Sequence, residues 1–439
     1  MLGVIADDVT GGTDVALSFT KAGLSTLVIF GQPQPTDAVA DHQVVVIALK
    51  TRTMAPAEAV GESLTAATWL QEHGATQLFF KYCSTFDSSP AGNIGQVADA
   101  LAACQQFGIT VIVPAPPQPR RTQYMGNLFV AQQPLAESPM QHHPLTPMRD
   151  SNVLRLLSTQ TSRPITLIDH DVVRAGSPAI RQALDNAAAA GIRYAVIDAI
   201  TDEDLEAVGA ACLNDRFLTG AAGLAAGLGA ALATTNGRQA THHDPVGAVP
   251  AAVLAGSCSA RTREQVAYMR DREPSYFLDV RATPDPAALA AAALTWFDTL
   301  TPGSVPLIYS TMDPARLTET QQHIGVARSA EILETATGII ARGLHDRGVR
   351  RIIIAGGETS GAVVDALDIR GGIIGQEMAP GVPWIYTTEP HPTALLLKSG
   401  NFGEQDLLVR AARAMPPTKA TNETADETAT AAREATTVA

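Results

Sequence analysis

Short apolar runs alternate along the chain with Ala- and Leu-rich segments in which apolar residues recur at helical spacing. This alternation is typical of βα units and predicts α/β architecture with mainly parallel sheets flanked by helices. Strands in the first half are expected at residues 2–6, 26–30, 44–49, 78–81, 110–113, 165–168 and 194–197. A second series is expected at residues 252–255, 306–309, 352–355 and 384–386. Each series predicts a domain with a Rossmann-like sheet.

The division of the chain follows from where this pattern fails. Residues 231–250 lose periodicity and gain Gly, Pro, Thr and His, as a linker does. We therefore expect an N-terminal domain over residues 1–245 and a C-terminal domain over residues 246–415, with a ligand cleft between them. Residues 416–439 contain no Leu, Ile or aromatic residue, which predicts a disordered tail.

One further stretch stands apart within the N-terminal half. Residues 114–150 are rich in Pro and Gln and too long for a simple connection, so they are expected to fold over a ligand.

Composition and charge exclude several classes of partner and site. The net charge of −13 disfavours nucleic acid as a partner, so an anionic substrate must be met by local Arg and Lys. No apolar run reaches the length of a membrane span. The four cysteines form no C-x-x-C pair, and the histidines have no metal-ligand spacing. We expect a cytoplasmic protein that acts on small molecules. It could form a homodimer, and the sequence does not identify metal ligands.

The first expected strand ends in IADDVTGGTD, residues 5–14. Ligands of open α/β sheets bind beyond the carboxyl ends of strands, which makes this turn a candidate site. In a dinucleotide site this turn would present backbone N–H groups to a pyrophosphate, but here Asp7 and Asp8 would repel phosphate. Their carboxylates can instead accept hydrogen bonds from a polyol or bind a cation. Consecutive residues face opposite ways, so one of the two should point at the ligand. Thr10 is a candidate helix cap. The alternative is a turn with capping carboxylates.

Two later strand ends carry cations and hydroxyl groups. The segment ALKTRT, residues 48–53, offers Lys50 and Arg52, and Arg binds a carboxylate through a bidentate fork. A solvated basic loop is the alternative. The segment FKYCSTFDSSPAGNIG, residues 80–95, suits a small hydroxylated acid, although such turns are often only caps. Its candidate residues are Lys81, Ser84, Thr85 and Asp87.

The second half contains glycine- and serine-rich loops. VLAGSCS, residues 253–259, and RIIIAGGETSGAVVDAL, residues 351–367, each place a strand before such a loop and a helix, an arrangement that binds phosphate. The second helix is expected to begin near Gly361. A later segment, LKSGNFGE, residues 397–404, adds Lys398 and two more glycines. The candidate residues of the three segments are Ser257, Ser259, Gly356, Gly357, Glu358, Thr359, Ser360, Gly400 and Gly403. Glu358 would share Mg²⁺ with the phosphates. Neither a P-loop nor a dinucleotide fingerprint is present.

Five motifs in this order, ADDVTGGTD, KTRT, KYCSTFDSSPAGNIG, AGSCSARTREQ and AGGETSGAVVDAL, resemble the four-carbon acid sugar kinase family over residues 2–412. The resemblance implies an N-terminal acid-sugar domain and a C-terminal ATP domain, with ATP and Mg²⁺ used to phosphorylate a terminal C4 hydroxyl. It also implies that Asp7, Asp8, Arg52 and the segment from Lys81 to Asp87 line the acid site, and that the glycine- and serine-rich loops bind nucleotide.

One segment indicates which substrate of the family this chain uses. Relatives acting on threonate or erythronate tend to carry a D-S-T-x-R-G-N-like run, whereas this chain has CSTFDSSPAGNIG, which favours 3-oxo-tetronate. Asp8 or Asp87 is expected to accept the hydroxyl proton, and Arg52 or Lys81 to anchor the substrate carboxylate. The alternatives are a kinase for D-threonate or D-erythronate, a sugar-acid aldolase or dehydrogenase, and a non-catalytic sensor of sugar acid and nucleotide.

Overall fold

The structure is a computed structural model that describes residues 1–35, 37, 39, 42–105, 108–118, 120–142, 146–236, 246–247, 249–388 and 392–414. The N-terminal half contains β1 (Leu2–Ala6), α1 (Val9–Lys21), β2 (Thr26–Phe30), β3 (Val44–Ala48), α2 (Pro56–Glu72), β4 (Gln77–Lys81), α3 (Ile94–Gln105), β5 (Thr110–Val113), β6 (Arg121–Tyr124), β7 (Asn127–Val130), β8 (Gln133–Pro134), η1 (Leu135–Glu137), η2 (Pro139–His142), α4 (Val153–Ser158), β9 (Ile165–Ile168), α5 (His170–Arg174), α6 (Ser177–Ala189), β10 (Tyr194–Ile197), α7 (Asp202–Ala211), β11 (Phe217–Gly220) and α8 (Ala222–Asn236).

The C-terminal half repeats the alternation of strands and helices. It contains β12 (Ala251–Ala255), α9 (Ala260–Arg270), β13 (Ser275–Phe277), α10 (Pro286–Phe297), β14 (Leu307–Tyr309), α11 (Pro314–Ile324), α12 (Val326–Asp346), β15 (Arg351–Ala355), α13 (Gly357–Ala366), β16 (Gly371–Ala379), β17 (Val382–Tyr386), β18 (Ala394–Lys398) and α14 (Leu407–Arg413). None of the helices in the described part of the chain is long and apolar enough to cross a membrane.

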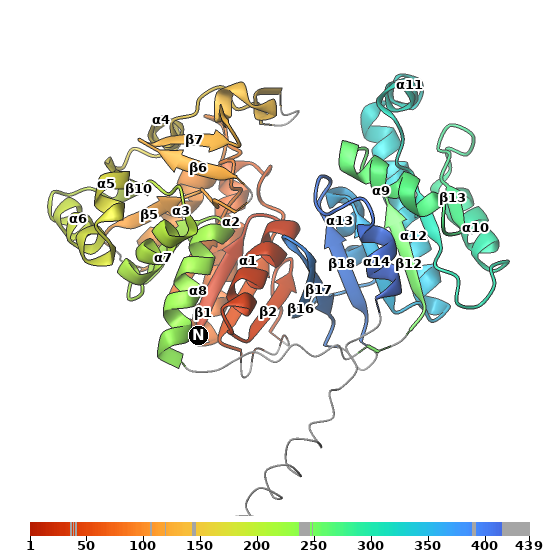
Figure 1. Ribbon diagram of the computed structural model, residues 1–439, viewed down its shortest axis with the longest axis horizontal. Helices are drawn as coiled ribbons and strands as arrows, with labels where there is room; N and C mark the ends of the chain where they lie inside the picture. The colour runs from red at the N-terminus through yellow and green to blue at the C-terminus, as the bar shows by residue number, and fades with distance from the viewer. Residues whose placement is uncertain are drawn as a thin grey trace, which may run out of the picture.

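The two predicted sheets join into one sheet of 15 strands, in the order β13-β14-β12-β15-β18-β17-β16-β2-β3-β1-β4-β11-β5-β10-β9. Most strand pairs of this sheet are parallel, whereas β17 pairs antiparallel with β16 and β18, and β16 pairs antiparallel with β2. Figure 1 shows the two halves side by side, with β16 and β17 between them. The predicted α/β class, with mainly parallel strands flanked by helices, is confirmed.

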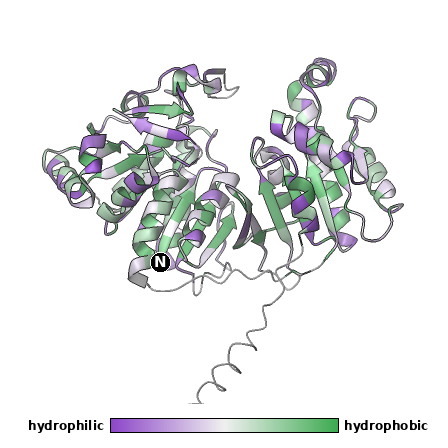
Figure 2. Cartoon of the chain, in the orientation of Figure 1, coloured by the Kyte–Doolittle hydropathy of each residue, from purple (hydrophilic) through white to green (hydrophobic). Residues whose placement is uncertain are grey.

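Burial of the central strands on both faces explains their continuous apolar runs. All five residues of β1 are buried, and its alternate side chains belong to different hydrophobic clusters. Val4 packs with α1 and α8 on one face, while Ile5 packs with α2 and α3 on the other. Figure 2 shows the hydrophobic colour concentrated on the strands and the hydrophilic colour on outward helix faces.

Close backbone approach at the junction of the halves requires glycine. A Cβ at Gly371 would lie 2.0 Å from the carbonyl oxygen of Val28 in β2, and a Cβ at Gly372 would lie 2.5 Å from the carbonyl oxygen of Tyr386 in β17. No larger residue fits between these strands without separating them.

Several local predictions need correction. The expected linker begins too early, because α8 continues to Asn236. Residues 114–150 contain the three-stranded sheet β6-β7-β8. Asp8, not Thr10, is the N-cap of α1, and α13 begins at Gly357 rather than near Gly361. The predicted disordered tail, residues 416–439, lies outside the described residues.

Candidate functional site

Three neighbouring strands bring the predicted acid-binding residues together. β3, β1 and β4 are adjacent and parallel, so the residues that follow them meet at one edge of the sheet. Arg52 follows β3, Asp7 and Asp8 follow β1, and Lys81 ends β4. Asp7 and Lys81 are only 3% and 4% exposed, and such burial of charge requires partners.

An ion-pair network supplies these partners. Arg52 donates from Nε to Asp7 Oδ2 at 2.9 Å and from Nη2 to Asp7 Oδ1 at 2.8 Å, a bidentate pair. The same Nη2 donates to Asp8 Oδ1 at 2.5 Å, and Lys81 Nζ lies 3.6 Å from that oxygen. Two cations therefore balance two carboxylates.

The two adjacent carboxyl groups differ in proton affinity. Burial raises the pKa of Asp7 above its ordinary value, and the charge of Arg52 opposes this. Burial also acts on Asp8, but the charges of Arg52 and Lys81 and hydrogen bonds to Asp8 lower its pKa to about 2. Asp8 further accepts bonds from Thr10 Oγ1 and Gly11 N, so it is a strongly held anion.

The loop after β4 is held by its own side chains. Asp87 accepts hydrogen bonds from Cys83 Sγ at 3.0 Å and from Thr85 Oγ1 at 2.6 Å. Burial raises the pKa of Cys83, and the charge of Asp87 adds to this, so the thiol remains protonated. The structure therefore places Thr85 and Asp87 in a mutually bonded turn, with the predicted Ser84 immediately before Thr85.

Two residues beside this network were absent from the sequence prediction. Asp14 lies on α1, three residues after Gly11, and interacts electrostatically with Lys81, Asp8 and Arg121. Burial raises the pKa of Asp14. Among the described residues, no hydrogen bond reaches its carboxylate. A Cβ on Gly381, in the turn between β16 and β17, would lie 3.6 Å from Asp14 Oδ1, so Asp14 faces the other half.

Arg121 is the second addition. It begins β6, in the segment expected to fold over a ligand. Its Nε is buried without a hydrogen-bond partner, and within the described ranges its guanidinium has no ion pair. Asp198 holds the turn after β6 by accepting the backbone N–H groups of Met125 and Gly126. The fold thus presents a cation that has no ion pair within the described residues and whose charge acts on Asp14.

In the C-terminal half, the loops after β12 and β18 are joined by hydrogen bonds. Ser259 caps α9, and its Oγ donates to the carbonyl oxygen of Gly400 at 2.6 Å. Lys398 is fully buried and donates to that oxygen at 2.7 Å and to Thr262 Oγ1 at 2.9 Å. Burial, with a contribution from Arg261, lowers the pKa of Lys398 to about 8.

The loop after β15 packs against the same region. Gly356 has φ = 138° and precedes α13, whose Ser360 Oγ donates to the Gly356 carbonyl oxygen at 2.7 Å. A Cβ at Gly256 would lie 2.2 Å from Thr359 Oγ1, so glycine is required there. Gly357 and Glu358 are exposed at the start of the helix, with their backbone N–H groups available to an anion. Gly403 has φ = 78° and ends the same cluster of loops.

Side chains connect the two groups of loops. Lys50 Nζ lies 2.8 Å from Asp365 Oδ2 on α13, and Lys21 of α1 pairs with Glu377 of β16 at 2.5 Å. The loop after β3, which also carries Arg52, therefore contacts α13, the helix that follows the glycine loop after β15. No group of three or more His, Cys, Asp or Glu side chains in the described residues is arranged to hold a metal ion by itself.

The chain matches two family models in sequence order. One, described as a sugar-binding N-terminal domain, matches residues 2–228, and the other, described as a nucleotide-binding C-terminal domain, matches residues 252–408. It is 44% identical over 420 residues to a 3-oxo-tetronate kinase of Pseudomonas fluorescens, covering 94% of this chain and 96% of the relative. The 3-oxo-tetronate kinase of Salmonella typhimurium is 40% identical over 420 residues, covering 94% and 98%.

Solved structures share the architecture. A Salmonella typhimurium LT2 protein provisionally named a tRNA synthase aligns with a TM-score of 0.88 and 39% identity, covering 94% of this chain and 99% of the other. A Haemophilus influenzae protein from a family of unknown function aligns with a TM-score of 0.80 and 38% identity, covering 93% and 98%.

Proposed function

The chain belongs to the four-carbon acid sugar kinase family, and from that premise we propose that it is an ATP-dependent kinase that phosphorylates the C4 hydroxyl of 3-oxo-tetronate. The observation that carries the proposal is the contact between Lys50 and Asp365, which brings the acid-side loops against the helix of the glycine loop. Phosphoryl transfer needs mainly positioning and charge neutralisation, which loops from two halves can supply. As part of this proposal we keep the predicted boundary between the two domains at residues 245 and 246.

Charge balance indicates how the substrate carboxylate is held. Arg52 is committed to Asp7 and Asp8, and Lys81 lies beside Asp8, so neither provides uncompensated charge. Arg121 does, because its guanidinium has no ion pair within the described residues. We therefore assign the substrate carboxylate to Arg121 rather than to Arg52 or Lys81, and the substrate hydroxyls to Asp8 and the loop after β4.

The proton of the C4 hydroxyl needs a carboxylate with suitable basicity. Asp8, with a pKa of about 2, is a weak base, and Asp87 is occupied by Cys83 and Thr85. Burial raises the pKa of Asp14, and its oxygens accept no hydrogen bond from the described residues. Asp14 also faces the C-terminal half, from which the phosphate comes. These features favour Asp14 as the proton acceptor.

The nucleotide phosphates fit the glycine- and serine-rich loops. The backbone N–H groups at Gly357 and Glu358 and the hydroxyl of Ser257 offer donors, and Lys398 adds positive charge behind the loop at Gly400. Lys398 is fully buried, so we do not expect it to contact the ligand directly. It positions the loop, and its charge declines above pH 8.

Magnesium fits the carboxylates beside these loops. Nucleotide-bound Mg²⁺ typically takes one or two carboxylates together with phosphate oxygens and waters. Glu358 is exposed in the first turn of α13, and Glu334 of α12 is near enough that the Glu358 charge, after burial, raises the pKa of Glu334. Glu358 and Glu334 would hold the ion, which neutralises charge on the phosphates.

The proposal is tested by incubating the protein with Mg-ATP and 3-oxo-tetronate, threonate or erythronate, and following ADP release and the mass of each product. We expect ADP and a 4-phosphate from 3-oxo-tetronate. Turnover of threonate or erythronate alone would overturn the substrate assignment. Nucleotide binding without turnover of any acid would favour the sensor.

Asp14→Asn should lower kcat by about 100-fold or more, the effect expected from losing general-base catalysis. ADP affinity should stay unchanged, as measured by isothermal titration calorimetry. Asp87→Asn is the matched control and should lower kcat by less than about 10-fold, because Asp87 serves its own loop. Wild-type kcat in Asp14→Asn would refute the assignment.

Arg121→Met should raise the KM for the acid by about 10- to 100-fold, the loss of a charge-assisted hydrogen bond of about 1.5–3 kcal/mol. The KM for ATP should not change, because Arg121 lies on the acid side. The neighbouring exposed residue provides the control, Arg120→Met, which should behave as wild type. Equal acid KM values in the two variants would contradict the role of Arg121.

A further inference from the structure

Lys50 reaches from the loop after β3 to α13 of the other half. Its Nζ lies 2.8 Å from Asp365 Oδ2, and the two side chains are about half and two-thirds exposed. An ion pair so exposed to solvent contributes little to stability, because water screens it and both side chains lose freedom in forming it. Lys50 can therefore exchange Asp365 for a more highly charged anion at little cost.

The face of α13 beside Lys50 carries no side chains towards the start of the helix. Gly357, Gly361 and Asp365 recur at intervals of four residues, so they share one face. A Cβ at Gly361 would lie 3.6 Å from Lys50 Nζ and 3.8 Å from Lys50 Cε, whereas a Cβ at Gly357 would meet no neighbouring group within 4 Å. These two glycines are about 6 Å apart along the helix axis. The long, flexible stem of Lys50 can swing past Gly361 towards the first turn of α13.

The charges around Lys50 lie at the same place. Burial and the charge of Glu358 raise the pKa of Glu334, and the charge of Lys50 opposes this shift. Lys50 therefore acts on one of the two carboxylates assigned to Mg²⁺, and the other lies in the first turn of α13. A cation at this position is within reach of a phosphate that shares the ion.

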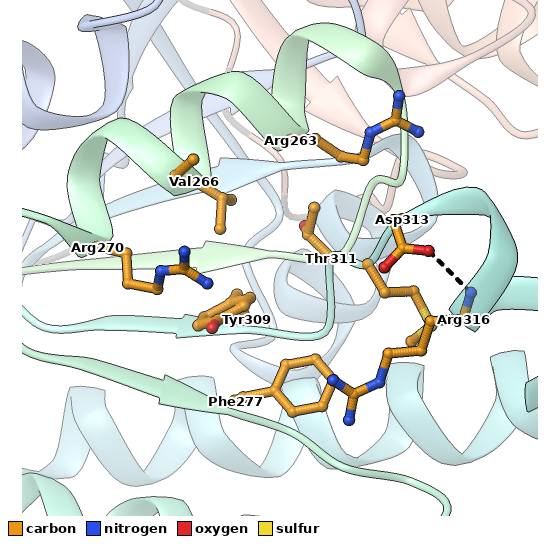
Figure 3. Close-up of a pocket in the computed structure, with 10 residues that line it drawn as sticks. Arg263, Val266, Arg270, Phe277, Tyr309, Thr311, Asp313 and Arg316 are labelled. Atoms are coloured by element: carbon orange, nitrogen blue, oxygen red, sulfur yellow. Dashed lines mark hydrogen bonds between the residues drawn. The ribbon is translucent and has the colours of Figure 1, made fainter.

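Two cations beside the phosphate loops of the C-terminal half are already bonded. Lys398 is fully buried and donates hydrogen bonds to its own loop and to α9. Arg263 donates to the carbonyl oxygen of Cys258 at 3.1 Å, and Figure 3 shows it on α9, at the wall of a pocket of about 360 Å³. Each would have to break these bonds to reach the terminal phosphate, whereas Lys50 would leave only an exposed ion pair.

We propose that Lys50 is a catalytic residue, which leaves Asp365 when both substrates bind and donates hydrogen bonds to the phosphoryl group during transfer. In this step the C4 oxygen bonds to the terminal phosphorus, and the bond from that phosphorus to the leaving oxygen of ADP breaks. The hydroxyl proton passes to Asp14. Lys50 keeps its own proton and stabilises the negative charge on the transferred group. This role rests on the proposed kinase function.

The test replaces Lys50 by Met, which keeps an apolar stem and removes the charge. We expect Lys50→Met to lower kcat with 3-oxo-tetronate by about 100-fold or more, the loss typical of removing one donor to a transition state. The KM for the acid and the affinity for ADP, measured by isothermal titration calorimetry, should stay within about 3-fold of wild type.

A binding measurement reports on the transferred group itself. ADP with aluminium fluoride mimics this group, and transition-state analogues bind more tightly than substrates. With the acid present, we expect aluminium fluoride to strengthen ADP binding to the wild type at least about 10-fold more than to Lys50→Met.

Asp365→Ala is the matched control, because it removes the same ion pair and keeps the cation. We expect Asp365→Ala to retain kcat within about 3-fold of wild type. If it loses as much kcat as Lys50→Met, the pair only holds the halves together and the catalytic role is overturned.

The remaining outcomes separate Lys50 from the kinase function. If the wild type phosphorylates 3-oxo-tetronate and Lys50→Met loses less than about 100-fold in kcat, the role of Lys50 is wrong and the kinase function stands. A higher KM for the acid at unchanged kcat would likewise overturn it, by assigning Lys50 to acid binding. If the wild type phosphorylates no acid, the kinase proposal fails and the role of Lys50 fails with it.

Discussion

The pairing of β16 with β2 is the constraint on which the arrangement of both halves depends. Only three residue pairs form this ladder, from Gly371 with Ile29 to Ile373 with Leu27, yet they join two parallel series into one sheet. The close approach is possible because Gly371 and Gly372 carry no side chains. Through this junction, α1 with Asp14 is brought against the turn at Gly381, and the loop with Lys50 against α13. The proposed reaction uses both contacts.

The sequence predicted most of the strands with continuous apolar runs, because burial on both faces leaves a local signal. It missed β11 and β18, although both are fully buried. β1, β2 and β5 agree with their predicted bounds, and β3 and β4 differ by one residue at one end. It did not predict β16, whose nine residues include three glycines and change partners along their length. Nor could local pattern show that two sheets join, because pairing between distant strands is decided by tertiary packing.

The residues of the candidate site were likewise predicted only in part. Asp7, Asp8, Arg52 and Lys81 were predicted because each follows a recognisable strand, and parallel strands share a carboxyl edge. Asp14 and Arg121 were not, since one lies inside a helix and the other in a segment without regular pattern. Their roles follow from which charges are already paired in the folded protein. This requires knowing that Arg52 is bonded to Asp7 and Asp8.

The central claim, that acid and nucleotide meet across the junction of the halves, is tested most directly by a crystal structure with a non-hydrolysable ATP analogue, Mg²⁺ and a tetronate. We predict the substrate carboxylate at Arg121 and the C4 oxygen about 3–3.5 Å from the terminal phosphorus, as in a reactive arrangement. An acid bound away from the Asp7–Arg52 network, or a C4 oxygen facing away from the phosphate, would contradict the account.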